Sequence, residues 1–167
     1  MKIFFVTLAA ALLFFLCPAH ARVSSLVVKV NGMACPFCAF GVEKRMQHVS
    51  GVESVAVDIQ AGTARATAGT DASIKYQDVP QAVKEAGFTS GDIRITAEGR
   101  MENATGNGLI LQMKDRFIPV TVGDDDLKKQ LTAVAGTGRE VVLKGRIVPQ
   151  KGGKWTLYPE IMELPEP

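Results

Sequence analysis

The feature that most constrains this fold is the order in which strand-like and helix-like hydrophobic patterns follow one another in the first half of the chain. Ser25–Val30 is dense in valine and leucine, which is typical of a strand. The next apolar residues share one helix face, because they recur at helical spacing: Ala39, Val42, Met46 and Val49. Ser50-Gly51 ends this predicted helix, since glycine readily takes the left-handed conformation that stops a helix. Residues 55–59 and 64–68 then alternate between apolar and small or polar side chains, which predicts a hairpin.

A second helix and a last strand complete the pattern. Asp78 stands before Pro80 and Gln81 at the start of a helical run, so the sequence predicts that Asp78 caps this helix and that Gln81 completes a capping box. Gly87 ends the helix, and Ile93–Ile95 forms a short strand. The resulting order, βαββαβ, is that of a split-βαβ or ferredoxin-like domain.

Two cysteines lie in the loop between the first predicted strand and the first predicted helix. Cys35 and Cys38 are separated by two residues, so both sulfurs can face one ion. The free N–H groups and the dipole of a helix start lower the pKa of a thiol, which favours the thiolate that binds metals. Two soft sulfur ligands suit Cu(I) or Hg(II). Zn(II) or Cd(II) would need donors from outside this loop, because a tetrahedral site takes four ligands.

The same half of the chain resembles a known family. Three features carry the likeness: the segment Gly32-Met33-x-Cys35-x-x-Cys38 between strand and helix, Ser50–Val55 after that helix, and Glu85–Phe88 after the second helix. Together they are similar to the heavy-metal-associated domain, which occurs in copper chaperones, in metal-pumping ATPases and in the periplasmic mercuric-ion carrier. The resemblance covers about residues 24–95.

This resemblance implies roles for individual residues. Cys35 and Cys38 would be the metal ligands, Met33 a buried support of the loop, and Phe88 a shield beside the metal. The pair Pro36-Phe37 departs from the small residues that many members carry between the cysteines. That departure leaves the choice of ion open but not the fold.

From Ala97 onward the pattern is mainly that of strands. We predict one helix at Asp125–Val134 and strands at residues 98–101, 109–114, 117–122, 140–148 and 155–163. Three strands, a helix and two strands fit a small five-stranded barrel of the OB type. The expected fold class is therefore α+β, with a ferredoxin-like domain at residues 22–96 and an OB-like β-barrel domain at residues 97–167. The sequence leaves open whether one continuous ribbon crosses the boundary.

The first 21 residues predict an exported protein. An apolar run at Ile3–Leu16 follows Lys2, and Ala19-His20-Ala21 supplies small residues where a signal peptidase cuts. The run is shorter than the ~20 residues that span a bilayer, so we expect cleavage rather than a membrane anchor. Removal of this segment would place the protein in the periplasm or outside the cell. It would also remove Cys17, which leaves Cys35 and Cys38 as the cysteines of the mature chain.

Charge and motifs exclude several classes of function. The chain has 19 Lys and Arg against 17 Asp and Glu, a net charge of +2 that argues against a nucleic-acid partner held by bulk charge. The sequence has no recognisable catalytic triad or phosphate-binding loop, so we predict a binding protein and not an enzyme. The expected partners are proteins that donate or accept the metal, with a membrane transporter as one candidate. For the barrel we expect a docking or scaffold role, because it has few aromatic residues, Phe117, Trp155 and Tyr158, on which nucleotides or sugars could stack.

Two other readings of the cysteine pair remain. An exported protein meets an oxidising compartment, and Cys-Pro-x-Cys resembles the redox motif of thioredoxin-like proteins, so the chain could be a thiol-disulfide oxidoreductase. Such a fold needs a proline opposite the cysteines, and the candidate, Pro80, is better explained as a helix-start residue. In the third reading the pair is an inert staple and the barrel is the functional part.

Overall fold

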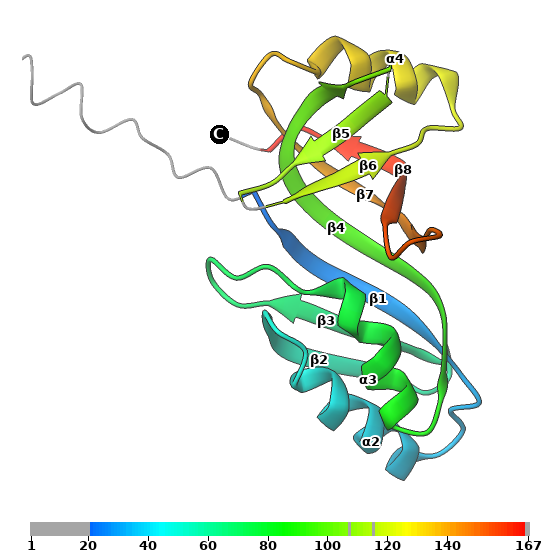
Figure 1. Ribbon diagram of the computed structural model, residues 1–167. Helices are drawn as coiled ribbons and strands as arrows, with labels where there is room; N and C mark the ends of the chain where they lie inside the picture. Colours follow the sequence, from blue (N-terminus) through cyan, green and yellow to red (C-terminus); the bar gives the residue numbers. More distant parts are fainter. Residues whose placement is uncertain (1–20, 107, 115, 166–167) are drawn as a thin grey trace, which may run out of the picture.

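The computed structural model of the protein describes residues 21–106, 108–114 and 116–165. Figure 1 shows the elements in the order β1 (Val23–Asn31), α2 (Pro36–Gln47), β2 (Val52–Asp58), β3 (Thr63–Ala68), a 3-10 turn (Tyr76–Asp78), α3 (Val79–Glu85), β4 (Thr89–Ala104), β5 (Gly108–Gln112), β6 (Phe117–Val120), α4 (Asp125–Val134), β7 (Glu140–Pro149) and β8 (Trp155–Glu163). The predicted export segment lies outside the described residues except for Ala21. Within the part of the chain that is described, no helix is long and apolar enough to cross a membrane.

The first half is the expected ferredoxin-like sheet. Its strands run in the order β2-β3-β1-β4, and each neighbouring pair is antiparallel. The hairpin of β2 and β3 pairs from Val52↔Ala68 to Asp58↔Thr63, with one register shift between Val52 and Ser54. Helices α2 and α3 lie against one face of the sheet (Figure 1). The buried residues of α2, Val42 and Met46, belong to the set whose helical spacing predicted this face.

The junction between the two halves is a single strand. The sequence predicted separate strands at residues 93–95 and 98–101, whereas β4 runs without a break for 16 residues. One edge of β4 pairs with β1 and then with β5, and the opposite edge pairs with β7 over residues 93–100. At Gly99 an added Cβ would lie 2.5 Å from the carbonyl oxygen of Gln112. A glycine is therefore required where β4 passes close to the backbone of β5, and it does not interrupt the strand.

The second half is a closed β-barrel. Pairing runs from β4 through β5, β6, β8 and β7 and returns to β4, so five strands form a circuit without a free edge. All of these pairs are antiparallel except β6 with β8, which are parallel and meet at Val120↔Leu157. Helix α4 connects β6 to β7 and is capped by Asp124, whose carboxylate accepts a hydrogen bond from the N–H of Leu127 at 2.8 Å. The predicted barrel of strands is confirmed.

One hydrophobic core extends through both halves. Alternate residues of β4 point to the same side, and they supply Ile93 and Ile95 to the first half and Ala97 and Met101 to the barrel. These residues belong to one contiguous cluster of buried side chains. The two halves are therefore joined by packing as well as by the shared strand.

An aromatic pair adds to this junction. The ring of Tyr76, before α3, meets that of Trp155, at the start of β8, edge to face with 5.6 Å between the ring centroids. Tyr76 is buried, and burial raises the pKa of its hydroxyl above the ordinary value although the charge of Arg116 opposes this shift. The contact therefore joins the two halves at a second place besides β4.

The predicted capping box before α3 is wrong. Asp78 precedes the helix, but its side chain makes no cap hydrogen bond and instead forms an ion pair with Lys75 at 2.9 Å. Gln81 donates to Glu85 rather than back to the helix start. The reason is the 3-10 turn at Tyr76–Asp78, which holds Asp78 in a helical conformation (φ −86°, ψ −12°) instead of the extended one that a capping side chain needs.

Candidate metal-binding site

Cys35 is the N-cap residue of helix α2. Its backbone is extended (φ −137°, ψ 154°), Pro36 occupies the first helical position, and its sulfur accepts a hydrogen bond from the N–H of Cys38 at 3.2 Å. A cysteine thus takes the place in which Ser, Thr, Asp or Asn usually satisfies the free N–H groups of a helix start. The structure confirms the prediction that both cysteines lie at a loop–helix junction. A negative charge on the Cys35 sulfur would be stabilised there by this N–H group and by the helix dipole.

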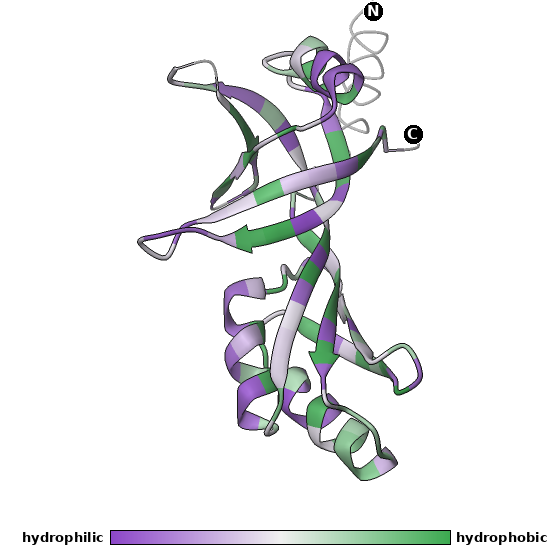
Figure 2. Cartoon of the chain, turned by 90° about the vertical axis from the view of Figure 1, so that its right-hand side faces the viewer, coloured by the Kyte–Doolittle hydropathy of each residue, from purple (hydrophilic) through white to green (hydrophobic). Residues whose placement is uncertain are grey.

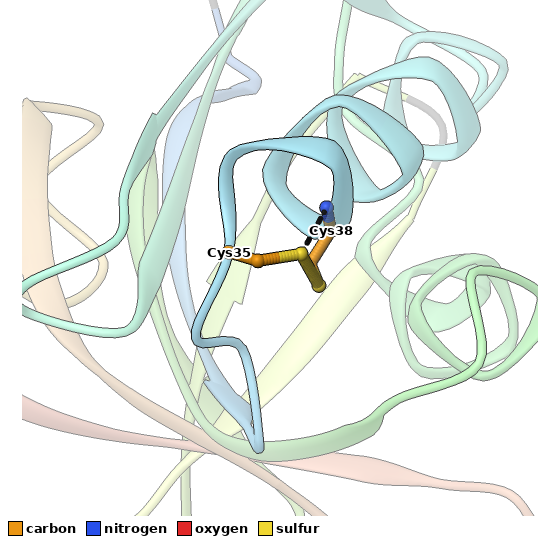
Figure 3. Close-up of a disulfide and its surroundings, with 2 residues drawn as sticks. All are labelled: Cys35 and Cys38. Atoms are coloured by element: carbon orange, nitrogen blue, oxygen red, sulfur yellow. Dashed lines mark hydrogen bonds between the residues drawn. A yellow bond between two sulfur atoms is a disulfide. The ribbon is translucent and has the colours of Figure 1, made fainter.

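The structure brings the two sulfurs together. Cys35 and Cys38 form a disulfide with their Cα atoms 5.1 Å apart, within the range of about 4.4–6.8 Å for such bonds (Figure 3). Both residues are half-buried, and Cys38 packs against the hydrophobic core. The pair therefore lies at the surface, while the buried side of its helix packs against the core.

The loop before the cysteines is supported as the resemblance implied. Gly32 takes a positive φ of 86°, which turns the chain from β1 into the loop. Met33 is 7% exposed and belongs to the core cluster, so its predicted role as a buried support of the loop fits its position. Phe88, after α3, is half-buried and packs on the core, and its role as a shield for the metal stays a prediction.

Two exposed aromatic side chains flank the cysteines. Phe37, between the cysteines, is 89% exposed, and Phe40, one turn later, is 59% exposed. The ammonium of Lys44 lies 5.6 Å from the centroid of the Phe40 ring. Sequence reasoning treated Phe37 only as a departure from the family and did not consider Phe40. The signal was present, because both phenylalanines fall outside the set of residues that forms the buried face of the helix.

Residues 27–89 match the heavy-metal-associated domain, and that stretch contains the second part of β1, the cysteine loop, both helices and the hairpin. The chain belongs to the heavy-metal-associated domain family. A search of curated proteins finds no match to the chain.

Several solved structures are similar to the heavy-metal-associated part. Oxidized MerP from Ralstonia metallidurans CH34 is 30% identical, with 42% of this chain and 96% of that chain covered and a TM-score of 0.38. A copper-binding domain from a P-type ATPase is 26% identical, with 41% and 90% covered and a TM-score of 0.37. The CopZ metallochaperone is 24% identical, with 41% and 100% covered and a TM-score of 0.37.

The heavy-metal-associated domain offers few further ligands. Among the described residues, no group of three or more His, Cys, Asp and Glu side chains is placed to hold a metal ion. His48 follows the other end of α2, where its Nδ1 lies 2.7 Å from the carbonyl oxygen of Lys44. An ion held by Cys35 and Cys38 would therefore depend on these two sulfurs and on donors from outside the described fold.

Proposed function

We propose that this protein captures a soft metal ion outside the cytoplasm through Cys35 and Cys38 and passes it to another protein. The observation that supports this most is the pair of neighbouring sulfurs at the start of α2, half-exposed, within a heavy-metal-associated domain. The family assignment supports metal binding, and the choice of these two ligands is our proposal.

Cu(I) and Hg(II) are the ions that this site suits best. Both accept two soft sulfur ligands, and the described residues near the loop add neither a carboxylate cluster nor a histidine. Zn(II) or Cd(II) would need sulfur or nitrogen donors from a second molecule to complete four ligands. A two-coordinate ion also leaves room for an incoming third sulfur, so transfer can proceed by ligand exchange.

The disulfide must be opened before an ion can bind, because the thiolate is the metal-binding form. A dithiol donor supplies the two electrons: it becomes a disulfide, and Cys35 and Cys38 become thiols. Metal binding then releases the thiol protons. The N–H of Cys38, which already points at the Cys35 sulfur, favours that deprotonation.

The remaining parts of the proposal concern the rest of the chain. Export through residues 1–21 would place the protein in the periplasm or outside the cell. We assign the barrel to the OB type, which is supported by a five-strand circuit with a helix between its third and fourth strands. We assign it a scaffold or docking role and no enzymatic one.

A metal titration of the reduced chain that starts at Arg22 tests the proposed function. We expect one equivalent of Cu(I) or Hg(II) to bind, with weaker binding of Zn(II) and Cd(II) at the same pH. Cys35→Ser with Cys38→Ser should abolish stoichiometric binding and leave the circular dichroism spectrum unchanged. His48→Ala, just past the other end of α2, is the matched control and should bind as the parent does. Undiminished binding by the double variant would refute the ligand assignment.

A thiol-disulfide oxidoreductase is the second candidate, and the disulfide at a helix start is the observation that favours it. Pro80 lies in the first turn of α3, as a helix-start residue should. An insulin-reduction assay separates the two functions, since each molecule of an oxidoreductase would reduce many insulin disulfides in the presence of a reductant. We expect no turnover above that of the double cysteine variant.

A further inference from the structure

We propose that Phe37, Phe40 and Lys44 form a docking face for the folded, thiol-bearing protein that gives the metal ion to Cys35 and Cys38 or takes it from them. These three residues are called the aromatic face below. The inference rests on the proposed function and adds to it the surface and the chemistry of the partner. All three side chains are exposed, so none of them belongs to the core of the domain.

The three side chains share one side of α2. Residues 37, 40 and 44 are spaced at three and four positions, so they lie along one stripe of the helix. The buried residues Val42 and Met46 are on a different side and face the sheet. In Figure 2 the hydrophobic residues of the cysteine loop and the first turns of α2 lie at the lower end of the molecule, away from the barrel. The aromatic face therefore has no neighbour within the described fold that covers it.

A folded partner must cover this face in order to exchange metal. A sulfur that takes the ion has to come within about 2.3 Å of it, as in other metal–thiolate bonds. Phe37 stands between the two cysteines in the chain and is 89% exposed. The surface that carries the incoming sulfur thus comes into contact with Phe37, and with Phe40 one turn further along. A small thiol can reach the same ion without such a contact.

The size of the aromatic face fits a transient complex. An aromatic side chain buries about 150–250 Å² when it is fully covered, so two rings bury a few hundred Å² at most. Stable interfaces bury about 1,200–2,000 Å² in total, and smaller ones are typical of short-lived encounters. This difference argues for a partner that docks and leaves and against a permanent dimer of the chain.

The charge beside the rings indicates what the partner carries. Arg45 forms an ion pair with Glu85 at 3.6 Å, whereas Lys44 has no carboxylate within ion-pair distance among the described residues. The first turn of α2 contains no acidic residue. A carboxylate on the partner opposite Lys44 would therefore be attracted, and such pairs mainly speed association and set orientation. The partner is expected to present its thiols beside an apolar recess with an acidic rim.

The test compares a folded and a small acceptor. The chain that starts at Arg22 is loaded with Cu(I) and mixed either with the copper-binding domain of the P-type ATPase or with glutathione. For Phe37→Ala with Phe40→Ala, we expect transfer to the folded domain to slow by about tenfold, which is the effect of losing a good interface anchor. Transfer to glutathione and the amount of bound Cu(I) should stay unchanged. Phe117→Ala is the control, because Phe117 on β6 is also exposed, at 61%, and lies in the barrel.

The charge is tested separately. Lys44→Glu should slow transfer to the folded domain at low salt, and the effect should shrink as salt screens it. Lys128→Glu, on the exposed side of α4, reverses the same charge far from the cysteines and should change nothing.

The outcomes separate this proposal from the proposed function. If the parent chain binds no Cu(I), the proposed function fails before docking is measured. If the chain binds Cu(I) but the aromatic variants transfer it to the folded domain at the parent rate, the docking face is refuted. Equal slowing with both acceptors would also overturn it, since the rings would then act on the metal site itself. The proposal would also be overturned if the metal-loaded parent sedimented as a dimer and the aromatic variants as monomers, because a second copy of the chain would then cover the aromatic face.

Discussion

The heavy-metal-associated half and the barrel share strand β4, yet the first half ends in an exposed cysteine loop whereas the second is a closed circuit of strands. The first half leaves its cysteine loop and two aromatic rings open at the end remote from the barrel (Figure 1). The barrel closes its strands into a circuit and buries most of its large apolar residues, while Phe117, Ile161 and Leu164 stay exposed. The proposed metal site thus lies in the open part, while β7 of the closed part covers one edge of β4. Substitutions in each half and reduction of the disulfide test how far the two halves differ and how far they act as one.

The largest effect is expected from a substitution in the shared strand. Ile95 is 2% exposed and its backbone lies between β1 and β7, so Ile95→Ala leaves a cavity in the core of the first half, on the strand that both halves share. The expected loss of unfolding free energy is about 2–5 kcal/mol. Urea denaturation should give one transition, at the same midpoint by Trp155 fluorescence in the barrel and by amide exchange in β1 and β3. Two separate midpoints would mean that the halves unfold independently.

A smaller effect is expected from opening the disulfide, which is confined to the first half. Cys35 and Cys38 are three residues apart, so the bond closes a short loop and constrains the unfolded chain by only about 2 kcal/mol. Reduction should therefore lower the stability of the chain modestly while β7 and β8 keep their amide protection. The measurement is urea denaturation with and without a thiol reductant. Collapse of the fold on reduction would instead support the reading of the cysteines as a structural staple.

The smallest effect comes from comparing two helix starts, one in each half. Asp124→Ala removes a carboxylate that accepts the N–H of Leu127, and it should cost about 1 kcal/mol of stability. Asp78→Ala removes a carboxylate that makes no cap bond and only an exposed ion pair with Lys75, so it should cost well under 1 kcal/mol. Thermal unfolding of both variants at pH 7 decides this. Equal losses would mean that the ion pair of Asp78 matters as much as a true cap.

Sequence reasoning worked best where a pattern was local and bounded by turn residues. The bounds of α4 and β8 agree with the prediction, because a helical or alternating run is flanked there by an N-cap aspartate or by the Gly152-Gly153 turn. The cysteine pair was placed at the start of α2 because strand, loop and helix signals follow one another without a gap.

What the sequence did not predict depends on contacts between distant segments. The closing pair of β6 with β8 is parallel and joins strands separated by a helix and another strand, so no local pattern encodes it. The continuity of β4 depends on partners at both of its edges, which periodicity along one strand does not report. Asp78 had the residue types of a capping box, but the turn before it fixed its backbone in the wrong conformation.

The sixteen residues of β4 also decide how this protein can be dissected. A cut at residue 96, where composition changes, would leave Ile93 and Ile95 with a bare edge in place of β7, and would leave the barrel without the strand that completes its circuit. Unprotected edges of this kind invite pairing with other chains. Either fragment would therefore have to keep residues 89–104, and one edge of that strand would need a new strand to pair with. The heavy-metal-associated half therefore cannot be moved into another protein by cutting the chain at residue 96.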